Sequence, residues 1–376
     1  MRGVLLLAIV LLTTVGNFET QGCSSQQTTP SSDEIFSTTD GVRFRVEVVV
    51  KGLEIPWSLA FAPDGRLFVT ERPGRVRIVD ISRGTSDVAL TLDDVFAEGE
   101  AGVLGVALDP AFASNRLLYL YYTARTSGKA ANRVVRYRES SGRLTEPAVL
   151  LDGIPANTIH DGGRLRFGPD GLLYVTTGDA AGEDQAQDVA SYAGKILRIN
   201  TDGTTPRANP FSSPIYSYGH RNPQGLDWHP VTGELWESEH GATGNDEINV
   251  IDAGANYGWP RIEGGTTLPM MRPPIVFYNP ALAPSGASFY RGQRLPPFTN
   301  NFFVATLRGT LLLRLQVNAA TRQVIGQERL LEGQFGRIRD VATGPDGNLY
   351  FCTSNRDGRG SPTSDDDRIA RLVPAS

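Results

Sequence analysis

"RFGPDGLLYVTTGD", residues 166–179, joins a tight turn to an apolar strand. The Pro-Asp-Gly turn supplies a fixed φ, a side-chain cap and a residue that accepts positive φ. The Leu-Tyr-Val run behind the turn alternates as a buried β-strand does. The stretch therefore predicts a strand that starts from a tight turn, and the rest of the chain repeats it.

Variants of this turn and strand occur six times, and a second strand usually follows closely, as in GRVRIVD (74–80). The copies begin at Phe61, Ala107, Arg166, Asp227, Pro296 and Ala342. A spacing of about 45 to 70 residues is typical of propeller blades with loops of variable length. Six blades of about 55 residues fill residues 41–374, so we predict an all-β, six-bladed β-propeller of four-stranded antiparallel blades. A pair of β-sandwiches is the alternative, but sandwiches do not repeat one turn motif at this period.

The first 40 residues have the composition of an export signal followed by a linker. One early arginine precedes an apolar run from Val4 to about Val15, which is short for a membrane span, and small polar residues follow. We predict a signal peptide over 1–22, a Ser/Thr/Gln-rich linker over 23–40 and the propeller over 41–376. Lipidation at Cys23 and plain cleavage both fit the pattern, so the exported protein is expected in the periplasm or outside the cell, either free or tethered as a lipoprotein.

The composition is that of a globular protein rich in turns. The chain has 41 glycines, 24 prolines and 40% hydrophobic residues. Its net charge is −5 and its basic residues form no cluster, so the sequence has no electrostatic footprint for nucleic acid. Its two cysteines make no disulfide framework, and Cys352, in an apolar strand, is expected to be a buried thiol.

Four polar clusters adjoin copies of the repeated motif. They are NTIHDGGRLRFGPDG (157–171), YSYGHRNPQGLDWHP (216–230), ESEHGATGNDEINVIDAGANYGWP (237–260) and RIRD (337–340). Loops that connect propeller blades converge at one end of the central channel, so these clusters are expected to share a site. Each cluster also has a structural interpretation. A lone histidine is more often structural than catalytic, the acidic glycine-rich loop lacks EF-hand spacing, and paired arginines often meet carboxylates.

Five segments together resemble the pyrroloquinoline quinone (PQQ)-dependent soluble glucose and aldose sugar dehydrogenases, the family with the glucose/sorbosone dehydrogenase domain. They are HDGGRLRFGPDGLLYVTTGD (160–179), YSYGHRNPQGLDWHP (216–230), EHGATGNDEINVIDAGANYGWP (239–260), LAPSGASFY (282–290) and RIRDVATGPDGNLY (337–350). The resemblance extends from about Leu53 to Leu372. It implies the same six-bladed propeller and an exported oxidoreductase that oxidises the anomeric C1 hydroxyl of aldoses to lactones.

The resemblance also implies the catalytic residues. His160 would be the general base that takes the proton of the anomeric hydroxyl, and Asp179 would orient it and raise its pKa. Arg221 would stabilise the negative charge that develops on the reduced quinone. Glu100 and His160 would contact the sugar, and an external quinone or cytochrome would accept the electrons.

PQQ and Ca²⁺ are the cofactors that the resemblance implies. The residues expected to hold PQQ are Arg221, Asn222, Arg308, Arg337, Arg339 and Gln187. The quinone has three carboxylates, and Arg308, Arg337 and Arg339 would provide one positive charge for each. For calcium, the resemblance implies the carbonyls of Gly241 and Ala242 beside the quinone, and Glu247, the Tyr257 carbonyl and Asp246 at a second, structural site.

The sequence departs from the glucose-specific members of this family at the substrate side. Ile159 and Glu100 stand where those enzymes have an acidic residue and a glutamine, and Asn279 and Ala281 lie where a tryptophan helps to form the glucose site. The long insertions that support dimerisation are absent from the sequence. These differences predict a monomeric enzyme with broad aldose specificity.

Two other function classes remain as alternatives. A calcium-dependent propeller hydrolase, such as a lactonase, would need carboxylate or asparagine side chains directed along the channel from each blade, and the sequence has no such set. A non-catalytic sugar-binding propeller could share the fold, because fold alone does not determine function. Both His160 and Arg221 are present, which favours the enzyme.

Overall fold

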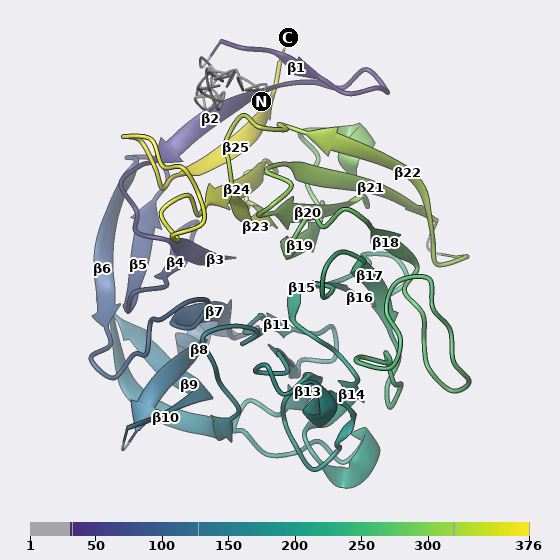
Figure 1. Ribbon diagram of the computed structural model, residues 1–376. Helices are drawn as coiled ribbons and strands as arrows, with labels where there is room; N and C mark the ends of the chain where they lie inside the picture. Colours follow the sequence, from purple (N-terminus) through teal and green to yellow (C-terminus); the bar gives the residue numbers. More distant parts are fainter. Residues whose placement is uncertain (1–30, 32, 127, 319, 376) are drawn as a thin grey trace, which may run out of the picture.

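The chain forms six β-sheets arranged radially around a central channel in the computed structural model, which confirms the predicted propeller (Figure 1). The structure describes residues 31 and 33–375, except 127 and 319. The predicted signal peptide and Cys23 lie outside the described residues. Among the helices that the structure describes, none is long and apolar enough to cross a membrane.

Each of the first three blades is a four-stranded antiparallel sheet whose first strand lies innermost. Blade 1 contains β3 (Pro56–Phe61), β4 (Leu67–Glu71), β5 (Arg75–Asp80) and β6 (Thr85–Thr91). Blade 2 contains β7 (Val103–Leu108), β8 (Leu117–Thr126), β9 (Lys129–Ser140) and β10 (Arg143–Ile154). Blade 3 contains β11 (Leu165–Phe167), β12 (Leu173–Thr177), β13 (Lys195–Ile199) and β14 (Ile215–Tyr218).

Blades 4 and 5 repeat this order, and blade 6 closes the ring with strands from both ends of the chain. Blade 4 contains β15 (Pro223–Trp228), β16 (Leu235–Glu239), β17 (Asp246–Ile251) and β18 (Val276–Tyr278). Blade 5 contains β19 (Pro284–Phe289), β20 (Phe302–Thr306), β21 (Leu312–Asn318) and β22 (Gln323–Leu330). Blade 6 contains β23 (Ile338–Thr343), β24 (Leu349–Thr353), β25 (Ile369–Pro374), β2 (Arg43–Val50) and β1 (Phe36–Ser37).

Helices are short and lie between strands. They are α1 (Phe112–Asn115) and the 3₁₀ turns η1 (Glu183–Gln187), η2 (Pro210–Ser212) and η3 (Pro296–Phe298). Strand β2 pairs with β25 in antiparallel register, Val46 opposite Leu372, so the N-terminal strand completes the C-terminal blade. The short strand β1 extends the same sheet from within the predicted linker.

The core lies between neighbouring blades. In β8, Leu118 and Leu120 belong to the cluster shared with blade 1, whereas Tyr119 and Tyr121 belong to the cluster shared with blade 3. Successive strand residues point to opposite faces, so a blade with both faces covered needs a continuous apolar run. Burial of each such leucine side chain stabilises the folded protein by about 1.5–3 kcal/mol. Cys352 is a buried free thiol in this core, as predicted.

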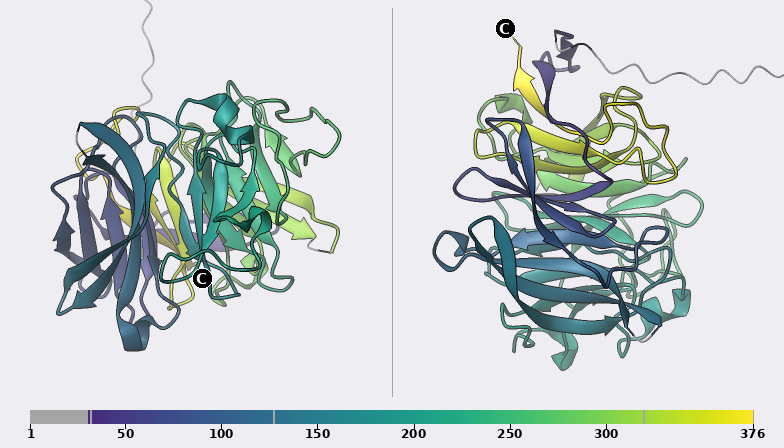
Figure 2. Two further views of the ribbon diagram at one scale, coloured as in Figure 1. Left: turned by 90° about the horizontal axis from the view of Figure 1, so that it is seen from below. Right: turned by 90° about the vertical axis from the view of Figure 1, so that its left-hand side faces the viewer.

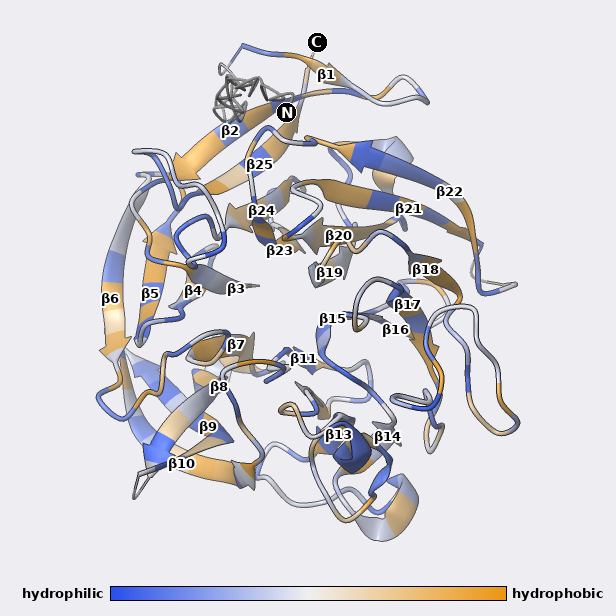
Figure 3. Cartoon of the chain, viewed as in Figure 1, coloured by the Kyte–Doolittle hydropathy of each residue, from blue (hydrophilic) through white to orange (hydrophobic). Residues whose placement is uncertain are grey.

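The predicted tight turns join the innermost strand of a blade to its second strand. Gly65, Gly171 and Gly347 all have left-handed φ, at 87°, 74° and 79°. In the turn of blade 3, the Oδ1 atom of Asp170 accepts the Leu172 N–H at 3.1 Å. Figure 3 shows apolar colour concentrated in the strands and polar colour in many of the connecting loops, and Figure 2 shows the blades from the side. The turns fix all six innermost strands in one direction along the channel.

Candidate active site

The predicted functional residues lie where the innermost strands begin. Glu100, His160, Arg221 and Arg337 come just before β7, β11, β15 and β23. We call this end of the channel the start mouth. One carboxylate joins three blades there, because Glu100 accepts hydrogen bonds from the His160 backbone N–H at 3.0 Å, Asn222 Nδ2 at 3.3 Å and Arg359 Nη1 at 2.7 Å. The structure therefore brings these segments together as the sequence predicts.

His160 is fixed by a buried carboxylate. Its Nδ1 lies 2.8 Å from Oδ1 of Asp179, whose Oδ2 accepts the Trp259 indole N–H at 2.8 Å. Because Nδ1 faces the carboxylate, that nitrogen carries the proton and Nε2 of the neutral ring remains able to accept one. The imidazole side chain is 13% exposed and Asp179 is fully buried. This is the arrangement of an oriented general base.

Backbone strain accompanies this base. His160 has a φ of 61°, in the left-handed region that favours glycine. Its carbonyl approaches Gly178 so closely that a Cβ there would lie 1.9 Å from the oxygen. A glycine at 178 is therefore required for the loop of His160 to pack against the end of β12.

Arg221 lies on the blade next to that of the base and beside the same tryptophan, and its carbonyl accepts the Asp179 N–H at 2.8 Å. Its Nη1 donates to the Gly241 carbonyl at 2.8 Å, and its guanidinium lies 5.1 Å from the Trp259 ring centre. The Arg221 backbone N–H donates to Glu239 at 2.8 Å. The Nε atom of Arg221 is buried and has no hydrogen-bond partner. The guanidinium is thus held in place, but one of its hydrogen-bond donors is unused.

Arg337 and Arg339 share one acid, Asp357. The Arg337 Nε atom donates to the Asp357 carboxylate at 2.8 Å, and Arg339 Nη2 lies 3.5 Å from the same oxygen. Burial lowers the pKa of Arg339 to about 10 against the opposing charge of Asp357, so the side chain is still protonated at neutral pH. The predicted arginine pair therefore contributes two cations at the start mouth.

Arg72 is a further buried cation that sequence analysis missed. It follows the end of β4, is 9% exposed, and has a buried Nε without a partner. Burial lowers its pKa, and the charges of Asp357 and Glu100 partly oppose this, which places Arg72 in the same electrostatic neighbourhood. A lone arginine after a strand carries no motif. Its backbone N–H donates to the Ile55 carbonyl, just before β3, at 3.0 Å, which relates it to the channel.

The remaining predicted quinone contacts are more dispersed. Asn222 accepts the Gly162 N–H at 3.1 Å and lies inside the start mouth. Gln187 donates to Asn256 and to the Trp259 carbonyl at 3.0 and 2.7 Å, so it supports the Trp259 loop from behind. Arg308 is exposed, in the turn between β20 and β21 on the rim of this mouth.

The predicted calcium ligands mostly make contacts within the protein. Asp246 accepts the Gly241 N–H at 3.0 Å on one oxygen and the N–H groups of Leu282 and Ala283 at 2.6 and 2.7 Å on the other. Asp246 thus connects blades 4 and 5. The Ala242 N–H donates to Glu263.

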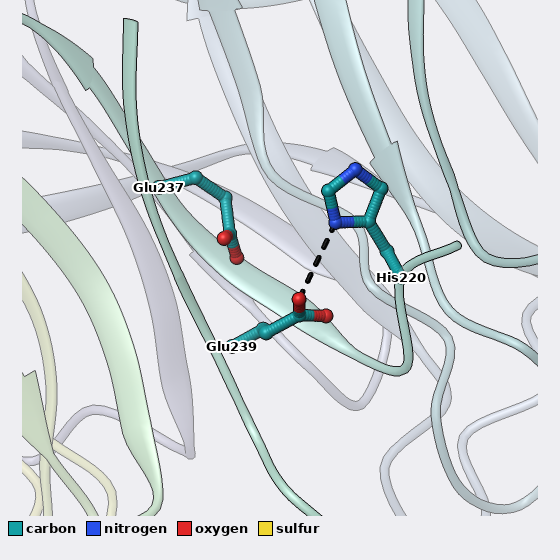
Figure 4. Close-up of side chains that lie close together, drawn as sticks. All are labelled: His220, Glu237 and Glu239. Carbon is teal, nitrogen blue, oxygen red and sulfur yellow. Dashed lines mark hydrogen bonds and ion pairs between the residues drawn. The ribbon is translucent and has the colours of Figure 1, made fainter. Parts of the chain in front are cut away.

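A buried acid cluster lies beneath these loops, and sequence analysis identified only part of it. Glu237, Glu239 and His220 place ligand atoms within 4.8 Å of one another (Figure 4). Glu247 is linked to both glutamates through the Asn249 amide, at 3.1 to 3.4 Å. Burial and the charge of Glu239 raise the pKa of Glu237 well above its usual value and that of Glu247 to about 8. The alternation of Glu237 and Glu239 along β16 was the signal in the sequence.

A small cavity adjoins this cluster. It has a volume of about 10 Å³ and is lined by residues that include Glu239, Glu247 and Tyr257. That volume admits a single water-sized sphere. One oxygen of Glu237 and the Asn249 carbonyl oxygen are buried without a partner. These two oxygens belong to the acid cluster and do not line the cavity, whereas the Glu239 and Glu247 carboxylates do. Clustered oxygen ligands with unused lone pairs are the chemistry that a hard cation needs.

Comparison with known proteins finds several sugar dehydrogenases. A model of the glucose/sorbosone dehydrogenase family matches residues 53–362, a span that includes every residue of the start mouth described above. Aldose sugar dehydrogenase YliI from Escherichia coli is 34% identical over 338 residues, covering 83% of this chain and 91% of that protein. Quinoprotein glucose dehydrogenase B from Acinetobacter calcoaceticus is 28% identical over 466 aligned positions, covering 98% and 96%. The PQQ-bound form of an aldose sugar dehydrogenase from Streptomyces coelicolor has a TM-score of 0.80 at 37% identity, covering 88% of this chain and 98% of that one.

Proposed function

Because this chain belongs to the glucose/sorbosone dehydrogenase family, we propose that it oxidises the C1 hydroxyl of aldose sugars to lactones with PQQ as cofactor. One observation carries the proposal: the His160–Asp179 pair lies at the same channel mouth as a group of buried arginines. A base that can accept a proton beside fixed positive charges suits the removal of a hydride and a proton from an alcohol.

The start mouth fits a flat, triply acidic guest. The Nε atoms of Arg72, Arg221 and Arg339 and the Nε2 atom of His240 are all buried, and none has a hydrogen-bond partner among the described residues. Buried donors of this kind are unfavourable unless something accepts from them, and the carboxylates and carbonyls of PQQ are acceptors. We assign Arg72, Arg337 and Arg339 to the quinone carboxylates, with Arg221 and Asn222 at its carbonyl side and Arg308 at the rim.

In the proposed reaction His160 takes the proton of the anomeric hydroxyl on Nε2. Asp179 then stabilises the imidazolium through the 2.8 Å contact to Nδ1. PQQ, when bound, supplies the two-electron acceptor for the hydride that leaves C1. Arg221 holds a positive charge where negative charge develops, and its contacts to Gly241 and Trp259 keep it there. Glu100 stays ionised throughout, because Arg359, His240 and the His160 N–H lower its pKa to about 2 despite burial.

Calcium belongs to the same proposal. The buried acid cluster, with Glu247 and the neighbouring Tyr257, has the oxygen donors for a structural ion. Beside the quinone, the carbonyls of Gly241 and Ala242 are the proposed ligands. The Gly241 carbonyl already accepts from Arg221, so a cation there would share that oxygen with the guanidinium.

The proposal also covers the setting of the enzyme. We propose a monomer of broad aldose specificity that is exported, either free or lipid-anchored at Cys23, and that passes electrons to an external quinone or cytochrome. The apolar run near the N-terminus and the sequence departures at Glu100, Ile159 and Asn279 support this part.

A titration tests the function. Protein freed of metal is titrated with PQQ and CaCl₂ while quinone absorbance and aldose-dependent dye reduction are followed. We expect saturable binding of one quinone per chain, and dye reduction that requires aldose and quinone together. Lactone hydrolysis with calcium alone would identify the hydrolase instead. Sugar binding without quinone binding or dye reduction would identify a non-catalytic propeller.

A further inference from the structure

The opposite end of the channel holds a second cavity. It has a volume of about 560 Å³ and is lined by the terminal residues of the innermost strands of all six blades and by the turns that follow them. The lining includes Arg166, Asp227, His229 and Arg291, and we call this end of the channel the end mouth. A cavity of this size accommodates a ligand as large as a monosaccharide derivative.

Buried side chains separate the end mouth from the start mouth. The Arg164 guanidinium is 1% exposed and lies 4.4 Å from the centre of the Trp57 ring, within the channel. It donates to the Gln224 carbonyl at 2.8 Å, and to Ser58 and Asp340 at 3.0 Å each. The end mouth is therefore a separate compartment, and none of the proposed catalytic residues lines it.

Three arginines lie at or next to the end mouth, and two of them have an acid. Arg164 pairs with Asp340 at 3.0 Å. Arg291 forms a bidentate pair with Asp227, at 2.6 and 3.0 Å. Arg166 forms no ion pair within the part of the chain that the structure describes.

Arg166 is also short of hydrogen bonds. It lies in β11, two positions after Arg164, which directly precedes the strand, so in extended backbone both side chains leave on the same face. Its Nε atom is buried without a partner, and Nη2 reaches the Ala287 carbonyl only at 3.5 Å. A half-buried guanidinium with unused donors in the wall of an open cavity is suited to bind an anion.

The neighbouring polar groups favour the same ligand. His229 Nδ1 accepts the N–H groups of Val231 and Thr232, at 3.2 Å each, which leaves the proton of the neutral ring on Nε2. Burial lowers the His229 pKa, so the ring is neutral at neutral pH. The Asp227 carboxylate is neutralised by Arg291 and also accepts the Phe289 N–H at 2.7 Å. Arg166 is therefore the charge in this wall that lacks a counterion among the described residues.

We propose that the end mouth binds a small oxyanion, a carboxylate or a phosphate group, through the guanidinium of Arg166. The planar fork of arginine matches both groups in a two-point contact. This site is independent of the proposed sugar oxidation, since it lies on the other side of the Arg164 barrier.

Calorimetry on the full chain tests the proposal with sodium phosphate and sodium gluconate as probes, at matched ionic strength. We expect saturable binding of at least one probe below about 50 mM, with a corresponding rise in Tm. Phosphate alone, gluconate alone or both would assign the site to phosphates, to carboxylates or to oxyanions in general. No binding of either anion, or anion binding that Arg166→Gln leaves unchanged, would overturn the proposal.

Four variants locate the binding. Arg166→Gln should weaken it at least tenfold, and Arg166→Lys, which retains the charge, should weaken it less. Arg43→Gln, an exposed arginine in the outer strand β2, is the matched charge control and should bind as the unmodified chain does. Arg337→Gln tests adventitious binding at the start mouth. Binding that survives Arg166→Gln but is lost in Arg337→Gln would place the anion at the wrong end.

Discussion

The two mouths of the channel are formed by the same six strands but are chemically different. At the end mouth, short turns such as 62–66 and 168–172 join the strands, and their residues serve backbone geometry. At the start mouth, longer loops such as 92–102, 155–164 and 178–194 join the strands, and they carry charged and strained residues. The comparison teaches that the turns that determine this fold and the loops that carry the proposed catalytic residues lie at opposite ends of the strands.

The strongest test of this comparison removes the base. His160→Ala should lower kcat by about 10³-fold, because a positioned general base typically contributes 10²- to 10⁴-fold. The PQQ Kd should change little, since buried arginines hold the quinone. Steady-state kinetics and a quinone absorbance titration measure the two effects. Equal loss of binding and turnover would make His160 a structural residue instead.

The matching variant at the other mouth is Arg166→Gln. It should leave kcat within about twofold, because Arg166 lies beyond the buried Arg164 barrier. A loss of turnover comparable to that of His160→Ala would contradict the chemical separation of the two mouths.

A second prediction concerns the stability of the start mouth. Asp161 follows the base, and one of its carboxylate oxygens is buried without a partner. Burial raises its pKa to about 7, although Asn132 and Asn157 hydrogen-bond to the other oxygen. The folded state therefore binds a proton that the unfolded state has released, so this residue's contribution to stability falls as pH rises from about 4 to 7.

Asp161→Asn should remove that dependence. The difference in unfolding free energy, variant minus unmodified chain, should be about 2–3 kcal/mol larger at pH 8 than at pH 5. This follows from two pH units at about 1.4 kcal/mol each. Urea unfolding at both pH values measures the gain. Asp93→Asn, at an exposed position, is the control, and its unfolding free energy relative to the unmodified chain should be the same at both pH values. A gain equal at both pH values would show that Asp161 is already ionised in the folded protein at pH 5.

The sequence was sufficient for the fold because turns are local. Pro-Asp-Gly determines its own conformation within a few residues, and its repetition gave the number of blades before any long-range contact was known. The Asp179–His160 contact and the grouping of Arg221, Arg337 and Arg339 followed from resemblance, with residues matched one by one.

Arg72 and Glu237 were not found because their roles depend on distant partners. Arg72 is isolated in the sequence, and its cationic neighbours lie more than 250 positions away in blade 6. Glu237 looks like an ordinary polar residue in a strand, yet it is fully buried against Glu239. Neither burial nor an unpartnered atom can be read from a single segment.

Arg72 offers a more specific test of the start mouth. Arg72→Gln should weaken PQQ binding by about 10- to 150-fold, since a hydrogen bond to a charged group contributes about 1.5–3 kcal/mol. The kcat at saturating quinone should change much less, because Arg72 is assigned to a quinone carboxylate and takes no part in the proton transfer. Arg308→Gln is the comparison, and its exposed side chain should affect the affinity less. If Arg308→Gln weakened PQQ binding more than Arg72→Gln did, Arg308 would be the third cation of the quinone site, as the sequence predicts.

The smallest expected effect concerns the rim that joins blades 2 and 6. Arg359 pairs with Glu100 at 2.7 Å, but its side chain is 53% exposed, so water screens the pair. Arg359→Gln should raise the aldose KM by about two- to fivefold and leave kcat nearly unchanged, because the pair orients Glu100 and takes no part in proton transfer. Arg125→Gln breaks the Arg125–Glu98 pair, in which the arginine is equally exposed, and should leave KM unaltered. If both variants shifted KM alike, general surface charge would explain the effect; if Arg359→Gln lowered kcat instead, Glu100 would belong with His160 in the chemistry of the start mouth.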